Sequence, residues 1–218
     1  MNVLSSQQKA LILLAPLLVI VQVIAFQLFD LWDHTWGYLL GFLFYWFLWC
    51  IPLTIIVCFK RKIGLKQLYA PIVDQQSNLV ALFLVFLPAV STGIVVFSEY
   101  VTIVDRNVIF LALLFALINA PLEELLWRKV YPMIFPRSIW WGFLYPTICF
   151  TAWHFAPALV RDSGMEGGIT AFVGGALFMG LVWGWYSYRY QTIIPSTIAH
   201  ILTNFFAFTG FLHVNFFA

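Results

Sequence analysis

Apolar residues fill seven long stretches of the chain, and short polar connections separate them. The stretches cover residues 11–29, 36–59, 79–97, 108–128, 142–160, 169–188 and 193–211. Each is close to the ~20 apolar residues that an α-helix needs to cross the hydrocarbon core of a bilayer. We therefore expect seven transmembrane helices, and the predicted fold class is an all-α, polytopic transmembrane helix bundle.

The connections indicate how these helices are oriented, because Lys and Arg accumulate on the cytoplasmic side of a membrane. Nine of the 11 basic residues fall on one side of the predicted bundle: Lys9, Lys60, Arg61, Lys62, Lys66, Arg128, Lys129, Arg137 and Arg189. Only Arg106 and Arg161 fall on the other side. We expect a cytoplasmic N-terminus and an external C-terminus, and since no eukaryotic targeting signal is visible, a prokaryotic plasma membrane.

The chain is predicted to form a single integral membrane domain, residues 1–218. Residues 1–106 supply the first three helices, and residues 107–218 form a four-helix part that carries the polar motifs. The first stretch is longer than the apolar part of a usual signal peptide and lacks a small-residue cleavage site, so it is expected to stay in the mature protein. Gly174, Gly175, Gly180 and Gly184 predict close helix packing along the sixth helix.

Composition excludes a soluble globule, since 63% of the residues are hydrophobic and only 9% are charged. A net charge of +2, with no basic run interleaved with aromatic residues, gives no reason to expect a nucleic-acid partner. Cys50, Cys58 and Cys149 lie in apolar stretches without metal-binding or disulfide spacing, so we expect buried thiols. The expected surroundings are the lipid bilayer.

Two adjacent carboxylates interrupt the fourth apolar stretch. A charged residue inside a membrane costs about 3 kcal/mol even on lenient insertion scales, so Glu123 and Glu124 are expected to be paired or functional. Glu124 and Arg128 are four residues apart and share a helical face, whereas Glu123 points about 100° away. Glu124 is therefore expected to pair with Arg128, and Glu123 needs a partner from another helix.

Two histidines in other predicted helices are candidates for that partner. His154 follows Phe150 by four residues, and His200 precedes Asn204 by four, so each pair shares one face of a helix. Polar groups in lipid are costly unless they meet, which predicts one shared site. A carboxylate and an imidazole can deprotonate a water, while a second imidazole and an amide can stabilise an oxyanion, which is the chemistry of hydrolysis.

The ordered set Glu-Glu-x-x-x-Arg, Phe-x-x-x-His and His-x-x-x-Asn resembles the CAAX protease and bacteriocin-processing (CPBP, or Abi) family of intramembrane endopeptidases, over about residues 111–211. The resemblance is to the type-II class of CAAX prenyl endoproteases. It implies that Glu123 and His154 activate the water, and that His200 and Asn204 form the oxyanion site. It also implies that Glu124, Arg128 and Phe150 are supporting residues.

The resemblance further implies a membrane-associated peptide or a lipidated, CAAX-like protein as the substrate. Family members have been described both as metalloproteases and as metal-independent glutamate proteases. We favour the second mechanism, with no cofactor; a divalent metal such as zinc would take Glu123, His154 and His200 as ligands. The chain differs from eukaryotic members in being short and in having seven rather than eight predicted spans.

Two questions stay open at this point. Counted from residue 142, His154 would lie roughly 18 Å from the inner boundary, deeper than Glu123, unless a kink at Pro146 or a tilt brings it level.

The alternative function is a non-catalytic multi-pass protein, either a transporter or a bacteriocin-immunity or scaffold protein, that uses the polar cluster for proton coupling or structure. For an enzyme we expect a hydrated cavity that opens towards the cytoplasm.

Overall fold

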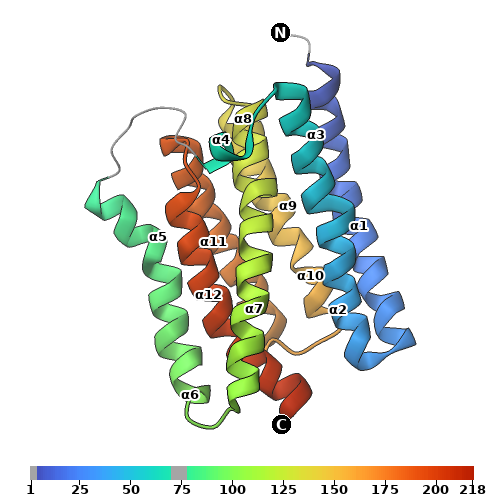
Figure 1. The fold of residues 1–218 in the computed structure, drawn as a ribbon, viewed down its shortest axis with the longest axis vertical. Coiled ribbons are helices and arrows are strands. Elements are labelled where there is room, and N and C mark those ends of the chain that lie inside the picture. Colours follow the sequence, from blue (N-terminus) through green and yellow to red (C-terminus); the bar gives the residue numbers. More distant parts are fainter. Residues whose placement is uncertain (1–3, 70–77) are drawn as a thin grey trace.

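The computed structural model describes residues 4–69 and 78–218, and this part of the chain is a bundle of helices without a strand (Figure 1). The longer helices are α1 (Ser6–Trp32), α2 (His34–Tyr45), α3 (Ile51–Arg61), α5 (Leu79–Thr92), α7 (Arg106–Glu123), α9 (Tyr145–Trp153), α11 (Gly168–Tyr190) and α12 (Ile194–Leu212). The shorter ones are α4 (Leu65–Tyr69), α6 (Ser98–Tyr100), α8 (Tyr131–Ile134) and α10 (Phe155–Ala158). Five π-helical turns complete the set: Trp46–Cys50, Gly93–Phe97, Glu124–Val130, Trp140–Leu144 and His213–Phe217.

Six helical segments in the described residues are long and apolar enough to cross a membrane: Ser6–Trp32, His34–Arg61, Leu79–Tyr100, Arg106–Ile134, Gly168–Tyr190 and Ile194–Phe217. They correspond to six of the seven predicted helices, and the all-α polytopic bundle is confirmed. The other predicted helix, residues 142–160, is divided into the turn at 140–144, α9 and α10. The protein is a multi-pass membrane protein; the number of spans stays a prediction.

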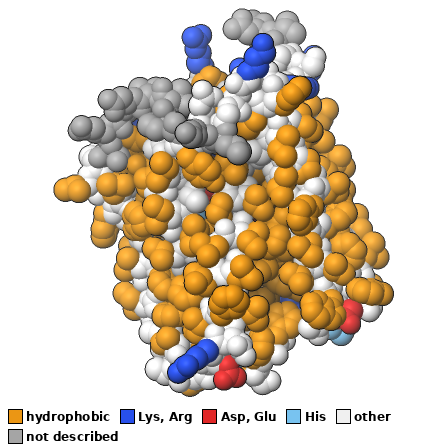
Figure 2. Space-filling model, in the orientation of Figure 1, with side chains coloured by type: hydrophobic (Ala, Val, Ile, Leu, Met, Phe, Trp, Pro, Cys, Tyr) orange, Lys and Arg blue, Asp and Glu red, His pale blue; other side chains and the backbone are white. Residues whose placement is uncertain are grey.

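The side of the bundle has the surface that lipid requires. Figure 2 shows hydrophobic side chains over most of this face, with the visible Lys, Arg, Asp and Glu gathered towards its two ends. Many large apolar residues are exposed, such as Leu13 (70%), Phe83 (66%) and Phe110 (64%). In water such a surface would drive aggregation, and in hydrocarbon it costs nothing. The two termini lie at opposite ends (Figure 1), as an odd number of crossings would place them.

α12 packs against both α7 and α5, and α11 packs against α9. α1 packs against α2 and also contacts α9 and α10, so the N-terminal helices pack directly on the C-terminal part. Tyr131 of α8 donates a hydrogen bond to the Leu11 carbonyl at 3.1 Å, and Tyr145 donates to the Ile12 carbonyl. This packing fixes the helices that carry the polar residues relative to one another.

The glycine stripe on α11 packs closely at only half of its length. A Cβ at Gly180 would lie 3.0 Å from Thr147 Cγ2, and one at Gly184 would lie 2.9 Å from Thr147 Oγ1, so α9 approaches α11 closely there. At Gly174 and Gly175 an added Cβ would meet nothing within 4 Å. The predicted close packing therefore holds at Gly180 and Gly184 and not at the other two.

Candidate active site

Both glutamates lie where the backbone of the fourth span changes its winding. Glu123 ends α7, and Glu124 begins the π-helical turn Glu124–Val130. π-helical turns inside helices occur frequently at functional sites, because the extra residue re-aims the neighbouring side chains. Both carboxylates are buried, with Glu123 1% and Glu124 0% exposed. Carboxylates at this depth need polar partners, and the neighbouring helices supply them.

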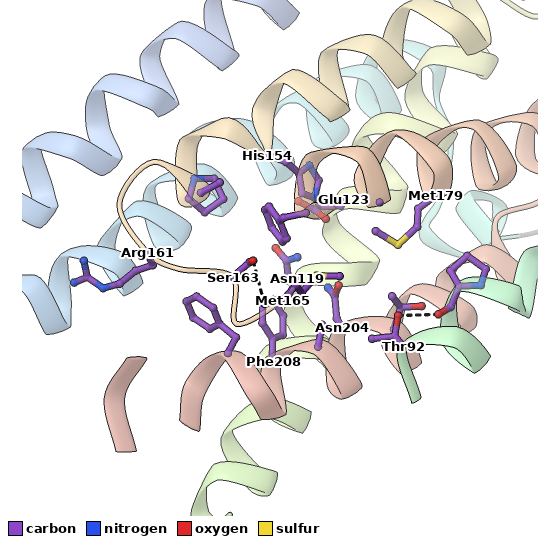
Figure 3. Close-up of a pocket in the computed structure, with 18 of the residues that line it drawn as sticks. Thr92, Asn119, Glu123, His154, Arg161, Ser163, Met165, Met179, Asn204 and Phe208 are labelled. Carbon is purple, nitrogen blue, oxygen red and sulfur yellow. Dashed lines mark hydrogen bonds between the residues drawn. The ribbon is translucent and has the colours of Figure 1, made fainter. Parts of the chain in front are cut away.

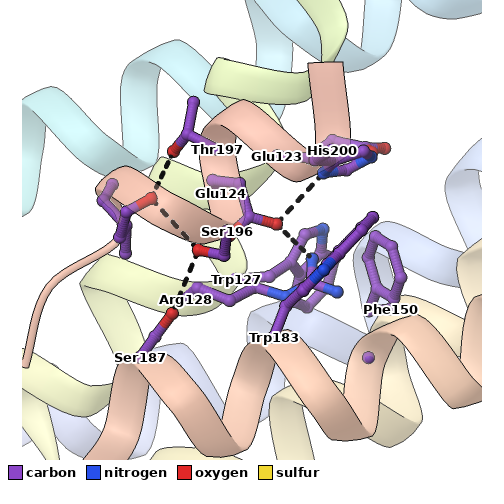
Figure 4. A network of polar contacts seen from close by, with 12 residues as sticks. Glu123, Glu124, Trp127, Arg128, Phe150, Trp183, Ser187, Ser196, Thr197 and His200 are labelled. Atoms are coloured by element: carbon purple, nitrogen blue, oxygen red, sulfur yellow. Dashed lines mark hydrogen bonds and ion pairs between the residues drawn. The ribbon is translucent and has the colours of Figure 1, made fainter. Parts of the chain in front are cut away.

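Glu124 forms the predicted ion pair with Arg128. Arg128 Nη1 lies 3.6 Å from Glu124 Oε1, and Arg128 is itself only 2% exposed. The guanidinium carbon lies 3.6 Å from the ring centroid of Phe150, which comes from α9. A planar guanidinium binds an aromatic face favourably, so the Phe150 ring stabilises the Arg128 cation. Figure 4 shows Arg128 between Glu124 and Phe150.

His200 of α12 lies between the two glutamates. Its Nδ1 is 3.0 Å from Glu124 Oε1, and its Nε2 is 3.4 Å from Glu123 Oε2. The Trp183 ring lies against its other side, with the ring centroids 4.5 Å apart. Glu123 was predicted to need a partner from another helix, and that partner is His200. Because both ring nitrogens face carboxylate oxygens, His200 joins Glu123 and Glu124 into one polar network (Figure 4).

His154 occupies the break between α9 and α10. Pro157 has no N–H to bond the Trp153 carbonyl, and its ring crowds that carbonyl, so the helix cannot continue regularly. His154 Nδ1 lies 2.8 Å from the Phe150 carbonyl oxygen, which can only accept a hydrogen bond. Nδ1 is therefore assigned the proton, and in its neutral form the ring presents an Nε2 lone pair that can accept one.

Glu123 and His154 line one cavity of about 190 Å³, together with Asn204 of α12 (Figure 3). His154 thus reaches the level of Glu123, and the distortion at this residue is the break before Pro157, whereas Pro146 lies in the first turn of α9. Three of the four residues predicted as catalytic meet at this cavity. The fourth, His200, touches Glu123 but is not among the lining residues.

Several polar atoms at the cavity have unused hydrogen-bonding capacity. Among the described residues, Asn204 Nδ2 has no hydrogen-bond partner, and the Glu123 oxygens, which lie near His200, Tyr45 and Asn119, make no hydrogen bond of good geometry. Buried polar groups in native proteins are almost always satisfied, so unused donors and acceptors that face a cavity indicate a place for a polar ligand. A water or a peptide group has the complementary chemistry.

Asn119 is a cavity residue that the motifs did not identify. It lies on α7 one turn before Glu123, is 3% exposed, and accepts a hydrogen bond from Trp46 Nε1 at 2.8 Å. The sequence does indicate this residue, since Asn119 stands four residues before Glu123, on the same helical face, in an otherwise apolar stretch. Trp153 also lines the cavity and stacks on Tyr45 with ring centroids 4.3 Å apart, and nothing in the spacing indicated that pair.

The cavity extends towards the loop that follows α10. Ser163 and Met165 line it, and Figure 3 shows this loop curling beside Ser163 on the side away from Thr92. Arg161, at the start of the loop, forms an ion pair with Asp30 of α1. Within the described residues the lining therefore extends towards the end of the bundle opposite the N-terminus. The expected cytoplasmic opening would lie at the other end.

The side chains at the site do not form a recognisable metal-ligand set. No group of three His, Cys, Asp or Glu residues in the described ranges is arranged to hold a metal ion. His200 directs Nδ1 at Glu124 and Nε2 at Glu123, so both of its ring nitrogens face carboxylates of the same network. The three cysteines are free, and none belongs to such a group.

Comparison with known families found a match in the C-terminal part of the chain. Residues 105–206 match the family model described as type II CAAX prenyl endopeptidase, Rce1-like. The matched region begins at the residue before α7 and includes Glu123, Arg128, His154, His200 and Asn204. No curated protein and no solved structure gave a significant match.

Proposed function

We propose that this multi-pass membrane protein is an intramembrane endopeptidase, because residues 105–206 match the family model of the Rce1-like type II CAAX prenyl endopeptidases. Its substrate would be a membrane-associated peptide with a lipidated, CAAX-like C-terminus. The observation that carries the proposal is the meeting of Glu123 with His154 at one buried cavity. With Nδ1 bonded to the Phe150 carbonyl, the Nε2 of a neutral His154 and the carboxylate of Glu123 would hold one water between them.

In the proposed reaction this water attacks the carbonyl carbon of the scissile peptide bond. Its proton passes to Glu123 or to His154 Nε2, and the tetrahedral intermediate carries the negative charge on the former carbonyl oxygen. The carbon–nitrogen bond then breaks, and the stored proton goes to the departing amine nitrogen. Since the site is buried, each of these charges is stabilised by the fixed polar groups around it.

Asn204 and His200 have different roles in this proposal. Asn204 Nδ2 is an unused donor at the cavity, which suits it to hold the developing oxyanion. His200 Nε2 contacts Glu123, so it holds that carboxylate in position for the water. The expected role of His200 as a second oxyanion donor requires Nε2 to leave Glu123, and it stays a prediction.

The experiment is cleavage of a prenylated, fluorogenic peptide by the purified protein in proteoliposomes. Glu123→Gln and His154→Ala should each reduce turnover by about 10³-fold or more, because each removes a group that moves the proton. Thermal unfolding of the variants in detergent checks that they remain folded. Turnover at the wild-type rate in folded Glu123→Gln would overturn the assignment.

The same assay separates the two catalytic mechanisms. On the metal-free proposal, dialysis against a strong chelator leaves turnover unchanged, and adding Zn²⁺ afterwards does not increase it. Loss of activity with chelator and its recovery with Zn²⁺ would instead establish a metalloprotease.

The competing function is a non-catalytic one, favoured by a single observation. Glu123, Glu124, Arg128 and His200 form a buried network of polar contacts, as expected of a proton-coupled site or a structural clasp. Substrate-dependent proton flux into liposomes, lost in Glu123→Gln without any peptide cleavage by the wild type, would favour transport. Cleavage without flux supports the protease.

A further inference from the structure

The cavity has two unlike walls. Asn119, Glu123, His154 and Asn204 form a polar wall around the proposed reaction centre. On the side of Thr92 and Met179 in Figure 3, the wall comes from α5 and α11, which contribute Pro88, Ser91, Thr92, Gly175, Phe178 and Met179. A peptide bond placed against the polar wall would direct an attached group at this second wall.

The second wall is apolar despite its two hydroxyl residues. Ser91 Oγ donates to the Pro88 carbonyl at 2.9 Å, and Thr92 Oγ1 donates to the same carbonyl at 2.8 Å. Both hydroxyl donors are thus used within α5, as is common for Ser and Thr in membrane helices. The remaining surface consists of hydrocarbon and the Met179 thioether, so an apolar group of a ligand fits there.

Gly175 is the position on this wall where a side chain is missing. It lines the cavity, it has ordinary helical backbone, and an added Cβ would meet nothing within 4 Å. This distinguishes it from Gly180 and Gly184, whose missing side chains are needed for close contact with α9. Gly175 therefore has no packing reason to be a glycine, and any larger residue there would project into open space at the cavity.

The helices α5 and α11 are joined by a hydrogen bond at Trp183, away from Gly175. Trp183 Nε1 of α11 donates to the Val85 carbonyl of α5 at 2.9 Å, and both residues belong to a small apolar cluster. Gly175 lies two helical turns before Trp183 on α11. Among the described residues, no hydrogen bond joins α11 to α5 at Gly175. The Trp183 contact fixes the spacing of α5 and α11, so the room beside Gly175 is a stable feature of the cavity.

We propose that Gly175 determines substrate specificity: its missing side chain makes room between α11 and α5 for a bulky apolar group attached to a residue that flanks the scissile bond. This inference rests on the proposed endopeptidase function and names a part of its substrate. The group is either the side chain that follows the bond or the lipid on the residue before it. Both have the same chemistry, and the experiment distinguishes them.

The test compares Gly175→Ala and Gly175→Leu with Gly174→Leu. Gly174 is the matched control, because a Cβ there also meets nothing within 4 Å, while the residue is exposed and does not line the cavity. One series of fluorogenic peptides carries a farnesyl cysteine and varies the next residue through Ala, Leu and Phe. A second series keeps Leu there and varies the lipid through geranyl, farnesyl and geranylgeranyl.

In one of the two series, Gly175→Leu should lower kcat/KM for the bulkiest peptide at least about tenfold more than for the smallest, since a filled apolar pocket discriminates by about that factor per methylene or more. The size selectivity of Gly175→Ala should lie between those of the wild type and Gly175→Leu, and Gly174→Leu should have the selectivity of the wild type. The series that responds identifies the group. Wild-type size selectivity for Gly175→Leu in both series would overturn the inference.

Binding separates this inference from the proposed function. Affinities of the same peptides, labelled with a fluorophore, are measured on Glu123→Gln with and without Gly175→Leu. Size-dependent binding without any wild-type cleavage would support the inference and overturn the endopeptidase. Cleavage without size dependence would overturn the inference alone, and the absence of both binding and cleavage would overturn both.

Discussion

At the residue scale, the adjacent glutamates differ by their neighbours. Glu124 has a cation and an imidazole within 3.6 Å, whereas Glu123 lines the cavity and has the His200 imidazole at 3.4 Å, with Tyr45 and Asn119 nearby. A carboxylate that is already paired is a poor base, and one that faces a cavity can meet a water. The difference follows from adjacent positions on a helix pointing about 100° apart.

Arg128 is expected to be a structural residue. Arg128→Met removes the buried cation and leaves Glu124 without it, which should lower the free energy of unfolding by about 3–5 kcal/mol, as in other buried ion pairs that lose one partner. Thermal unfolding in detergent measures the loss. Arg128→Lys keeps the charge but loses the planar contact with Phe150, so an intermediate value is expected. Wild-type stability of Arg128→Met would contradict this role.

Asn204 is expected to act on the reaction itself. Asn204→Ala should reduce kcat by about 10²–10³-fold with little change in KM, since an oxyanion donor binds more strongly in the transition state than in the ground state. Steady-state cleavage of the prenylated peptide gives both constants. Asn215→Ala is the control, because Asn215 bonds to the Asp162 and Phe211 carbonyls and does not line the cavity. An effect on KM alone would indicate a binding role for Asn204.

At the scale of elements, two departures from regular helix place the catalytic groups. The candidate span Arg106–Ile134 winds into a π-helical turn at Glu124, and the helical stretch 142–160 breaks at His154 ahead of Pro157. The first makes the side-chain directions differ from those of a regular helix, and the second lets His154 bond the Phe150 carbonyl. Such irregular backbone is frequent at functional sites, and here it occurs next to Glu123 and at His154.

The contact between α9 and α11 should be sensitive to side-chain size. Gly184→Val would place a Cβ 2.9 Å from Thr147 Oγ1 and 3.0 Å from a Phe143 ring carbon, so α9 must move away. Overpacking of this kind costs about 1–3 kcal/mol, and it also shifts the helix that carries His154. Thermal unfolding and peptide turnover should therefore both fall. Gly174→Val, where nothing is close, should match the wild type in both measurements.

At the scale of the whole molecule, the ends of the bundle carry the charges and the cavity extends towards one of them. Lys60 and Arg61 lie near the N-terminal end, and the loop with Arg161 lies at the other, beside Asp30. If Lys and Arg mark the cytoplasmic side, the described cavity lining extends towards the external side.

Labelling of intact cells tests this orientation. With Cys58→Ser as the background, Arg61→Cys and Glu166→Cys place single exposed thiols at opposite ends of the bundle. A membrane-impermeant maleimide should label Glu166→Cys in intact cells and Arg61→Cys only after lysis, because the basic end is cytoplasmic. The reverse pattern would show that the N-terminus is external, and labelling of both in intact cells would contradict a membrane-spanning bundle.

Much of the fold could be predicted because apolar length and basic connections are properties of the chain itself. The multi-pass character follows from stretches near 20 apolar residues, and the Glu124–Arg128 pair follows from a spacing of four, which the π-helical turn did not disrupt. The break in the predicted helix 142–160 was not foreseen, because the predicted length ignored Pro157. A proline ends regular hydrogen bonding three to four residues earlier, which is where His154 lies.

The sequence by itself determined that Glu123, His154, His200 and Asn204 had to find partners, since polar groups in hydrocarbon are costly alone. It could not determine which partner each one takes, because that depends on how far apart helices lie and how they are rotated. Only the tertiary structure decided that His200 joins the two glutamates while Glu123 and His154 share a cavity. It also decided which glycines on α11 touch α9 and which border open space.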